Sequence, residues 1–351
     1  MDRTHFIKQF NPAYSKYLRQ RVEQAKDYFE DEIIKNAIER VYEIFGKQGK
    51  RVRPYTLYLM YKSAGGKKDE DAIITGIGSE LQHAFALIHD DVCDRGDIRH
   101  GLKSIQVVVK EQLSAQGITF DIEHLANCQA MLIGDLTLSW AYAALNPLEN
   151  PNKDRVVFHF QEMAIKEVSG EMMDISFPSR HNVADSELNK RDLFKTAADT
   201  FVYPMLMGAV LAGKEKELGP FCEQFGSLMG EVYQIQDDIL DIVGEAGTPE
   251  FSDIREHQHT FLTQYVLSHG SKEDRSVLVK FFSGGDANPE NEKQVLSIVS
   301  KPAVLDFAKA ESTKRINQAK EELQKAGFAA EYEALWLDVV GFFEKRFDSQ
   351  A

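Results

Sequence analysis

The sequence is poor in cysteine and tryptophan and has no excess of positive charge. Among 351 residues there are three cysteines and two tryptophans, and 41 Lys and Arg stand against 55 Asp and Glu, giving a formal net charge of −14. Cys93, Cys128 and Cys222 form no CxxC pair and have no zinc-ligand spacing, so we expect buried free thiols. We expect no nucleic-acid partner, because no surplus of cations exists to neutralise phosphates.

The sequence also lacks a hydrophobic run that could cross a membrane. The longest apolar stretch, YPMLMGAVLAG at residues 203–213, is too short to span a bilayer. The first residues, MDRTHFIKQFNP, contain no apolar segment of the signal-peptide type. We therefore expect a soluble, cytoplasmic protein without a transmembrane segment.

Apolar residues recur with helical periodicity along most of the chain. Between residues 16 and 45 they return every three or four positions with charges between them, which predicts a first helical region. The segment GKQGKRVRP at residues 46–54 ends this region, and Pro54 suits the first turn of the next helix. Further helices are expected at residues 71–93, 104–115, 122–145, 152–174, 188–212, 218–243, 258–269, 273–283, 291–299 and 302–347.

Strand signals are nearly absent, and we find no βαβ rhythm, internal repeat or low-complexity linker. The breaks between the helical stretches are short, and none resembles an interdomain tether. These features predict an all-α protein in which residues 1–351 form one large helical domain.

Two acidic clusters with the same DDxxD spacing interrupt apolar helical patterns. The first follows the apolar run in LQHAFALIHDDVCD, and the second lies in VYQIQDDILD. The first and last carboxylates of each cluster are four residues apart, so they share one helix face. The clusters are Asp90, Asp91 and Asp94 near the first third of the chain and Asp237, Asp238 and Asp241 further on.

These carboxylates require a cation. A single DDxxD is ordinarily a solvated helix face, but two copies embedded in apolar helices are harder to explain in this way. If the two helices face each other, six carboxylates converge, which only divalent cations make tolerable. Oxygen ligands without His or Cys favour Mg²⁺, and neither cluster has the loop of an EF-hand.

Basic residues lie close to these clusters in the sequence. There is no Walker A loop, and each basic residue taken alone would be assigned to the surface. Their grouping favours a site that binds diphosphates both directly and through Mg²⁺. The candidates are Lys50, Arg51 and Arg53 in GKRVRP, then Arg95, Arg99 and Lys103 after the first cluster, and Lys195 beside Thr196 in LFKTAAD.

Taken together, these motifs resemble those of the trans-isoprenyl diphosphate synthases of the polyprenyl synthetase family. The resemblance implies an all-α bundle around a deep central cavity, usually a homodimer. It implies condensation of isopentenyl diphosphate with an allylic diphosphate (dimethylallyl, geranyl or farnesyl) and release of pyrophosphate. The matching segments are GKRVRP (49–54), LQHAFALIHDDVCD (81–94), DIRHG (97–101), LIGDLTL (132–138), SGEMMD (169–174), KTA (195–197) and YQIQDDILD (233–241).

The resemblance also implies roles for individual residues. Up to three Mg²⁺ per site would be bound by Asp90, Asp91 and Asp94 and by Asp237, Asp238 and Asp241, and Lys195 would join the catalytic set. The diphosphate of isopentenyl diphosphate would be bound by Lys50, Arg53 and His83. The allylic substrate would contact Arg99, Lys195, Thr196 and Gln234.

The sequence departs from the family pattern at three positions. His100 stands where a second arginine would help to bind isopentenyl diphosphate, and Lys103 is a possible substitute. A histidine is mostly neutral at pH 7. Pro249 and Gln258 stand where the family usually has lysines that contact the allylic diphosphate. The rate and affinity of the family reaction are therefore open, as is a specialised role.

Two residues before the first cluster are candidates for the control of product length. Phe85 lies about 7 Å from Asp90 along a helix, where its ring could form the floor of the cavity or simply pack in the core. An aromatic residue here, with Ala86 beside it, resembles the archaeal geranylgeranyl (C20) pattern, and C15 or C25 are the neighbouring lengths.

Two other functions are compatible with the same motifs. A class I terpene cyclase on this fold would ionise a prenyl diphosphate without condensing it, but it would have no use for Lys50, Arg53 and His83. A non-catalytic regulatory subunit of a prenyl synthase would have little reason to keep both DDxxD clusters. A generic helical scaffold leaves the matched motifs unexplained.

Overall fold

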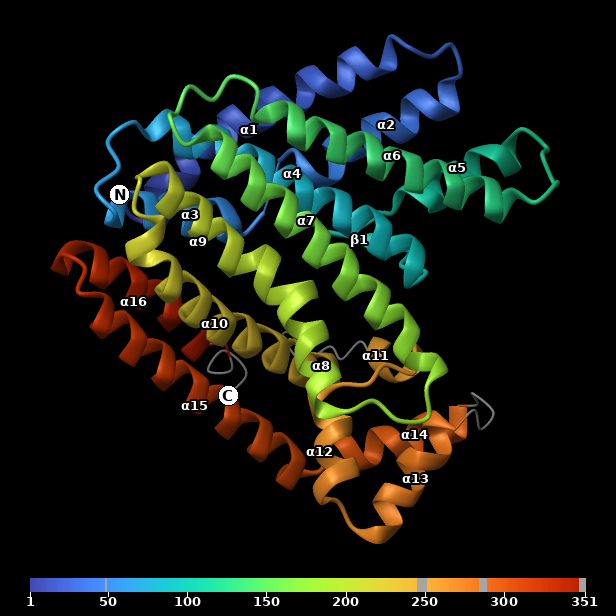
Figure 1. The fold of residues 1–351 in the computed structure, drawn as a ribbon. Coiled ribbons are helices and arrows are strands. Elements are labelled where there is room, and N and C mark those ends of the chain that lie inside the picture. Colours follow the sequence, from blue (N-terminus) through green and yellow to red (C-terminus); the bar gives the residue numbers. More distant parts are fainter. Residues whose placement is uncertain (48, 245–250, 284–288, 347–351) are drawn as a thin grey trace. The chain divides into compact units, whose positions relative to one another are not determined.

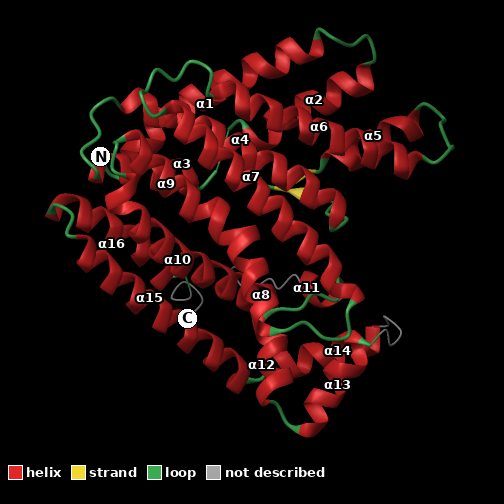
Figure 2. Ribbon diagram, in the orientation of Figure 1, coloured by secondary structure: helices red, strands yellow, loops and turns green. Residues whose placement is uncertain are grey.

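The computed structural model describes residues 1–47, 49–244, 251–283 and 289–346, and nearly all of its regular structure is helical (Figures 1 and 2). The predicted all-α class is confirmed. Strands in the described part are limited to β1 (Ile98–Arg99) and β2 (Leu102–Lys103), an antiparallel pair in which Ile98 lies opposite Lys103. No helix in these residues has both the length and the apolar character that a bilayer crossing needs.

The chain forms two compact units, which are described separately. Unit 1 comprises residues 1–160 and 207–214, and unit 2 comprises residues 161–206 together with the described residues from 215 onward. A single domain over residues 1–351 stays a prediction.

Unit 1 is built around one long helix, α4 (Asp69–Cys93), which packs against α3 (Val52–Ser63) and α6 (Ile122–Ala144). Leu81, Phe85 and Ile88 of α4 are all buried in this core. The other elements are α1 (Arg3–Lys26), α2 (Glu32–Phe45), α5 (Ile105–Ala115), the start of α7 (Lys153–Ser176) and the end of α9 (Tyr203–Leu211).

A glycine fixes the end of α4 that carries the first acidic cluster. A Cβ atom at Gly134 of α6 would lie 2.2 Å from Cδ2 of His89, so only glycine permits this approach of the two helices. His89 also contacts the carbonyl oxygen of Met131 through Nε2 at 3.0 Å. Since His89 directly precedes Asp90, these contacts position the start of the cluster.

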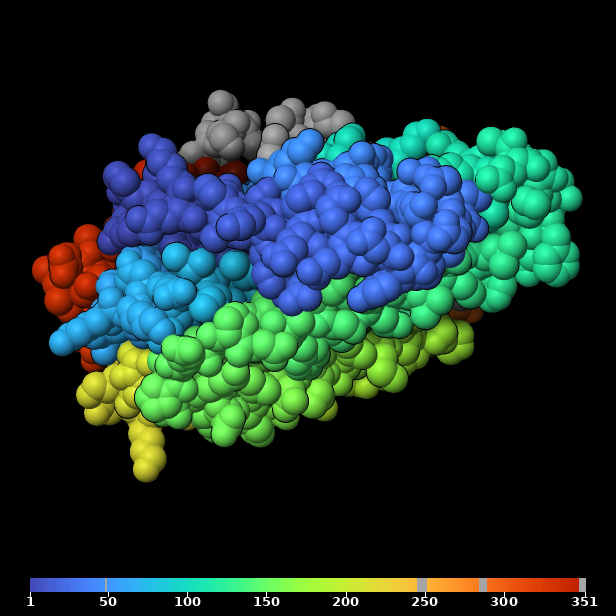
Figure 3. All heavy atoms as spheres, turned by 90° about the horizontal axis from the view of Figure 1, so that it is seen from above, coloured from blue at the N-terminus to red at the C-terminus, as the bar shows by residue number. Residues whose placement is uncertain are grey.

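The N-terminal helices form an outer face of unit 1, which is coloured blue in the space-filling view of Figure 3. Phe6, Phe10 and Tyr14 of α1 are fully buried, and their rings stack in sequence at centroid distances of 5.3 and 5.8 Å. This aromatic row explains why α1 belongs to the folded core although the sequence pattern indicates helix only from residue 16.

Unit 2 is organised around α10 (Glu215–Val243), which packs against α15 (Pro302–Ala326) and the π-helical segment η2 (Leu193–Val202). A Cβ atom at Gly230 would lie 2.1 Å from that of Ala197, so this glycine lets α10 and η2 approach closely. The remaining elements are η1 (Phe177–Ser179), α8 (Asp185–Asp192), α11 (Ser252–Arg255), α12 (Phe261–His269), α13 (Lys272–Phe282), α14 (Pro289–Val299) and α16 (Ala330–Glu344).

Two predicted helices are each split in two. The region 16–45 contains the break between α1 and α2, where Asp31 caps α2 by accepting hydrogen bonds from the backbone N–H groups of Ile33 and Ile34. The region 302–347 contains the break between α15 and α16 at Gly327, which has a left-handed φ of 64°. Apolar periodicity continues across both breaks, which is why the pattern does not reveal them.

The expectation of buried thiols is wrong for two of the three cysteines. All three are free, but Cys93 and Cys128 are exposed and only Cys222 is buried. Cys93 lies at the end of α4, where the helix leaves the core. Cys128 lies on a solvent-facing position of α6, close to His124.

Candidate active site

Arg99 supplies the positive charge beside the first acidic cluster. Its Nη2 atom donates to Oδ2 of Asp90 at 2.9 Å and to Oδ1 of Asp91 at 2.6 Å, and its Nε donates to the same Asp91 oxygen at 2.9 Å. The Asp91 side chain is only 4% exposed, and burial raises the pKa of Asp91 in spite of Arg99. Arg99 therefore compensates a buried carboxylate. The contact of Arg99 with the allylic substrate, which the resemblance implies, stays a prediction.

The residues that surround this pair follow the end of α4. Asp94 is the C-cap of the helix, and its backbone N–H donates to the carbonyl oxygen of Asp90 at 2.8 Å. His100 has a left-handed φ of 52° in the turn between β1 and β2. Burial, followed by the neighbouring Arg99, lowers the pKa of His100, which agrees with a neutral ring at pH 7.

The GKRVRP segment divides into one buried and two more accessible cations. Arg51 is 3% exposed, donates to Oε1 of Glu80 at 2.6 Å and lies 4.4 Å from the ring of Tyr14. These contacts make Arg51 part of the core of unit 1. Lys50 is exposed and Arg53 is half-buried in the first turn of α3, so both remain candidates for an anion site.

The two residues assigned to product length lie on different sides of α4. Phe85 is 4% exposed, and its ring meets that of His89 edge to face at a centroid distance of 4.5 Å. Ala86 is half-buried. The Phe85 ring thus lies directly against the residue that precedes the first cluster.

In unit 2 a chain of hydrogen bonds leads from the KTA motif to the second acidic cluster. Thr196 donates through Oγ1 to Oε1 of Gln234 at 2.8 Å, and Gln234 donates through Nε2 to Oδ1 of Asp238 at 2.9 Å. The backbone N–H of Phe261, the first residue of α12, donates to the other Asp238 oxygen at 2.7 Å. Three predicted site residues therefore form one network: Thr196 lies 38 positions before Gln234, and Gln234 lies four positions before Asp238.

Further acidic groups line the same side of α10. Oδ1 of Asp241 accepts from the backbone N–H of Ser252 at 2.8 Å and from its hydroxyl at 2.7 Å, while the buried Oδ2 has no hydrogen-bond partner within the described residues. Burial and the nearby Asp192 raise the pKa of Asp238 to about 7. Burial, followed by Asp238 and Asp241, also raises the pKa of Asp253 well above its usual range.

This arrangement fits a divalent cation. A cavity of about 250 Å³ opens over the cluster, and carboxyl groups and amide or hydroxyl oxygens dominate its polar lining. A carboxylate oxygen without a partner and two carboxyls with raised pKa values gain most from a bound cation. The lining residues are Gln234, Asp237, Asp238, Leu240, Asp241, Ser252, Asp253 and Arg346.

Lys195 lies in a second network behind this cluster. Its Nζ contacts Oδ2 of Asp174 at 2.6 Å and Oε2 of Glu171 at 2.8 Å. The buried guanidinium of Arg191 pairs with Asp174 and also with Asp192. Burial alone would raise the pKa of Asp174, but Arg191 and Lys195 outweigh it and hold that pKa below its usual value.

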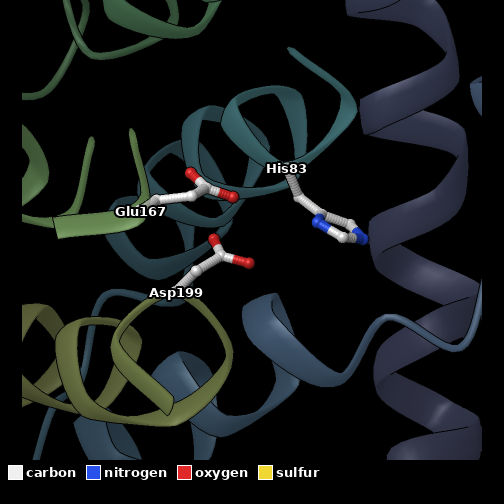
Figure 4. Close-up of side chains that lie close together, drawn as sticks. All are labelled: His83, Glu167 and Asp199. Carbon is white, nitrogen blue, oxygen red and sulfur yellow. The ribbon is translucent and has the colours of Figure 1, made fainter. Parts of the chain in front are cut away.

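Sequence reasoning missed several of these partners. Asp174 and Glu171 stand in the SGEMMD segment, whose acidic residues could have been matched with Lys195, but Asp253 and Arg346 stand in no recognised motif. Glu167 of α7 and Asp199 of η2 are also buried, and their carboxylates lie within 4.8 Å of each other (Figure 4). His83, labelled in the same figure, lies on α4 in unit 1.

Gln258 and Pro249 stand at the two positions where the family usually has lysines. Gln258 is buried at 9% exposure, and its Oε1 has no hydrogen-bond partner in the described part of the chain. It does not line the cavity over the second cluster. Pro249 lies outside the described residues.

Comparison with known proteins settles the family. The family model of the polyprenyl synthetases matches residues 33–299. The chain belongs to the polyprenyl synthetase family. It is 30% identical over 292 residues to geranylgeranyl diphosphate synthase of Sulfolobus acidocaldarius, covering 81% of this chain and 82% of the relative.

Two further proteins resemble the chain at lower sequence identity. A (2E,6E)-farnesyl diphosphate synthase of Mycobacterium bovis is 26% identical over 285 residues, covering 80% of this chain and 74% of the relative. The crystal structure of geranylgeranyl pyrophosphate synthase from Corynebacterium glutamicum, complexed with isoprenyl diphosphate and magnesium, matches with a TM-score of 0.86 at 23% identity, covering 96% of this chain and 99% of that structure. This likeness shows the isoprenoid-synthase fold.

Proposed function

We propose that this family member is a prenyltransferase that condenses isopentenyl diphosphate with an allylic diphosphate and releases pyrophosphate. The observation that carries the proposal is the acidic cavity in unit 2. Asp238, Asp241 and Asp253 line it, and Oδ2 of Asp241 has no hydrogen-bond partner within the described residues. The names of the relatives, which include geranylgeranyl and farnesyl diphosphate synthases, support the same reaction class.

The residues of the chain have distinct tasks in this proposal. Asp237, Asp238 and Asp241 would bind Mg²⁺ in unit 2, and Asp90, Asp91 and Asp94 would bind Mg²⁺ in unit 1. The family resemblance implies up to three Mg²⁺ per site. When bound, this metal neutralises charge on the leaving diphosphate. Gln234 and the Phe261 N–H fix the Asp238 carboxylate, and Thr196 fixes Gln234 in turn. Lys195, whose Nζ pairs with Asp174 and Glu171, would bind the allylic diphosphate.

The remaining cations are assigned to the second substrate. Lys50, Arg53 and His83 would bind the diphosphate of isopentenyl diphosphate, with His100 in place of an arginine. Arg99 pairs with Asp90 and Asp91, so it contributes to substrate binding chiefly by holding these carboxylates. The apolar residues that flank both clusters would keep water away from the allylic cation.

The preferred product in this proposal is geranylgeranyl diphosphate (C20). Phe85 is the residue that would stop chain growth. The buried position of its ring against His89 supports this assignment. Farnesyl and C25 products are the alternatives, because relatives carry both the geranylgeranyl and the farnesyl name.

The decisive experiment is an assay of the purified full chain with Mg²⁺, isopentenyl diphosphate and one of dimethylallyl, geranyl or farnesyl diphosphate. Products are identified by mass spectrometry. A linear prenyl diphosphate that is longer than the starter supports the proposal. Hydrocarbons or alcohols formed without isopentenyl diphosphate would instead identify a terpene cyclase, and absence of turnover with every starter would favour a regulatory subunit.

A further inference from the structure

A C-terminal arginine reaches the second acidic cluster. Arg346, two residues beyond the end of α16, forms an ion pair with Asp237. Its guanidinium carbon also lies 5.1 Å from the centroid of the Tyr233 ring, one helical turn before Asp237. The Arg346 side chain is 10% exposed, so it is largely enclosed at the cavity over the cluster.

The backbone near Arg346 is anchored to the same stretch of α10. Gln236, the residue before Asp237, donates through Nε2 to the carbonyl oxygen of Phe343 at 2.9 Å and to Oγ of Ser312 at 3.2 Å. The Arg346 N–H donates to that same Phe343 carbonyl at 3.3 Å. The Phe343 ring is buried and contacts the ring of Tyr233. Gln236 of α10 thus fixes the backbone turn that follows α16, and the adjacent Asp237 pairs with the Arg346 side chain on that turn.

Arg346 is the sole basic residue among the described residues that line this cavity. Asp237, Asp238, Asp241 and Asp253 line it as well, so carboxyl groups dominate the lining. Gln258 occupies a position where the family pattern has a lysine, but its side chain is buried outside the cavity. Among the described lining residues, Arg346 therefore supplies the positive charge that a negatively charged substrate would meet in this cavity.

We propose that Arg346 is a substrate-binding residue that exchanges partners. It neutralises Asp237 in the metal-free protein, and it binds the diphosphate of the allylic substrate once Asp237 coordinates a divalent cation. The guanidinium suits this exchange, because it binds a carboxylate and a phosphate with the same pair of N–H donors. The identity of the diphosphate rests on the proposed function, whereas the competition between Arg346 and a cation for Asp237 does not.

The proposal predicts that Arg346→Gln changes two binding affinities in opposite directions: that for Mg²⁺ alone and that for pyrophosphate. The substitution removes the Arg346 guanidinium that competes with a cation for Asp237. Mg²⁺ affinity in the absence of diphosphate should therefore rise about fivefold, the size expected for a partly exposed ion pair. The affinity for pyrophosphate in saturating Mg²⁺ should fall about tenfold, because a charge-assisted contact is lost. A residue that only stabilised the fold would weaken both.

Both affinities can be measured by isothermal titration calorimetry on the full chain, first with Mg²⁺ alone and then with inorganic pyrophosphate in saturating Mg²⁺. Arg346→Lys should weaken pyrophosphate binding about threefold, less than Arg346→Gln, since it retains the charge but loses the paired donors. Arg275→Gln is the matched control, because Arg275 is an exposed arginine of α13 that does not line the cavity.

The proposal is overturned if pyrophosphate affinity stays unchanged in Arg346→Gln, or if Mg²⁺ affinity falls. If Arg346→Gln does not fold, Arg346→Lys decides: its pyrophosphate affinity should be about threefold weaker than that of the unchanged protein, and full affinity would contradict the proposal. The Mg²⁺ titration contains no substrate. Its outcome is therefore separate from whether the protein makes prenyl diphosphates.

Discussion

The backbone N–H of Phe261 donates a 2.7 Å hydrogen bond to Oδ2 of Asp238 across 23 residues of sequence. Phe261 begins α12, so the partially positive N-terminus of that helix faces the buried carboxyl. With Gln234 on the other oxygen, Asp238 is held from both sides. Its geometry is therefore determined before any cation is present.

Asp238→Asn tests whether this carboxylate takes part in the reaction. Because burial raises the pKa of Asp238 to about 7, the neutral side chain is already well populated near neutral pH. We expect the free energy of unfolding without metal to change by less than about 1 kcal/mol. Loss of a metal-binding charge should lower Mg²⁺-dependent turnover by roughly 10² to 10³-fold.

Urea unfolding in a chelator and steady-state kinetics measure these two quantities. Asp306→Asn, at an exposed position of α15, is the control and should change neither. Turnover of Asp238→Asn within a few-fold of the unchanged protein would remove Asp238 from the proposed metal site.

Arg99→Gln tests the charge balance of the first cluster. The variant leaves the buried Asp91 carboxyl without its guanidinium partner, so we expect a loss of about 3 kcal/mol in unfolding free energy at pH 8. The loss should be smaller at pH 5, because the pKa of Asp91 is already raised by burial and the unpaired carboxyl will take up a proton there.

The double variant Arg99→Gln with Asp91→Asn should recover most of the lost stability, since no buried charge remains. Chemical denaturation of the single and double variants at both pH values gives the coupling free energy. Additive effects of the two substitutions would mean that the ion pair has no energetic role.

The buried His259 ring should lower the free energy of unfolding in mild acid. Its ring is buried and stacked on Phe282 at a centroid distance of 3.8 Å, and burial lowers its pKa from 6.5 to about 4. The unfolded chain therefore binds the proton first, so this residue removes stability as pH falls from above 6.5 toward 4, by up to about 3 kcal/mol.

The raised pKa of Asp238 acts in the opposite direction over part of this range, so the test is a difference between variants. His259→Phe keeps a ring against Phe282 but cannot titrate. In metal-free buffer its unfolding free energy should decline less between pH 7.5 and pH 4.5 than that of the unchanged protein. Equal declines would show that His259 is not the group responsible.

The parts of the site that could be predicted from the sequence are those encoded by short-range spacing. The DDxxD spacing places Asp237 and Asp241 on one helix face, and both do lie on α10, whereas in the first cluster α4 ends at Cys93 and Asp94 is its C-cap. The KTA segment is recognisable from its residues, but its π-helical geometry is not, because π-helical turns are rare and the apolar spacing around the motif also fits an α-helix.

The partners of these residues could not be predicted, because they depend on tertiary packing. Arg346 meets Asp237 from 109 positions away, and no pattern near residue 346 indicates it. Arg51 and Arg53 stand two positions apart in one motif, but only Arg51 is buried on Glu80. Local sequence cannot distinguish them without the position of α4.

An exposed apolar stripe on α7 predicts self-association. Ile165, Val168, Met172 and Ile175 recur at helical spacing in unit 2, with exposed fractions of 56, 41, 68 and 50%. A stripe of this kind on a helix surface is typical of an interface, and we expect it to be covered by a second copy of the chain. Light scattering after gel filtration should give twice the 39.8 kDa chain mass.

The variant Met172→Glu should shift that mass toward 39.8 kDa at low micromolar concentration, because it places a charge in the centre of the stripe. Val279→Glu changes an isolated apolar residue of α13 that is 51% exposed, and it serves as the control. A monomeric unchanged protein would contradict the expected homodimer, and a dimer that tolerates Met172→Glu would place the interface elsewhere.

Phe85 connects core packing with product length. Its buried ring lies five residues, or about 7 Å, before Asp90 along α4. If the ring limits chain growth, Phe85→Ala should shift the products toward longer prenyl diphosphates while isopentenyl diphosphate is in excess. The deleted ring also leaves a void in the core, so we expect a loss of about 3 kcal/mol in unfolding free energy. Phe10→Ala, in the buried aromatic row of α1, creates a similar void elsewhere in unit 1 and separates the two effects. An unchanged product length in Phe85→Ala, or an equal shift in Phe10→Ala, would show that the Phe85 ring is an ordinary core side chain.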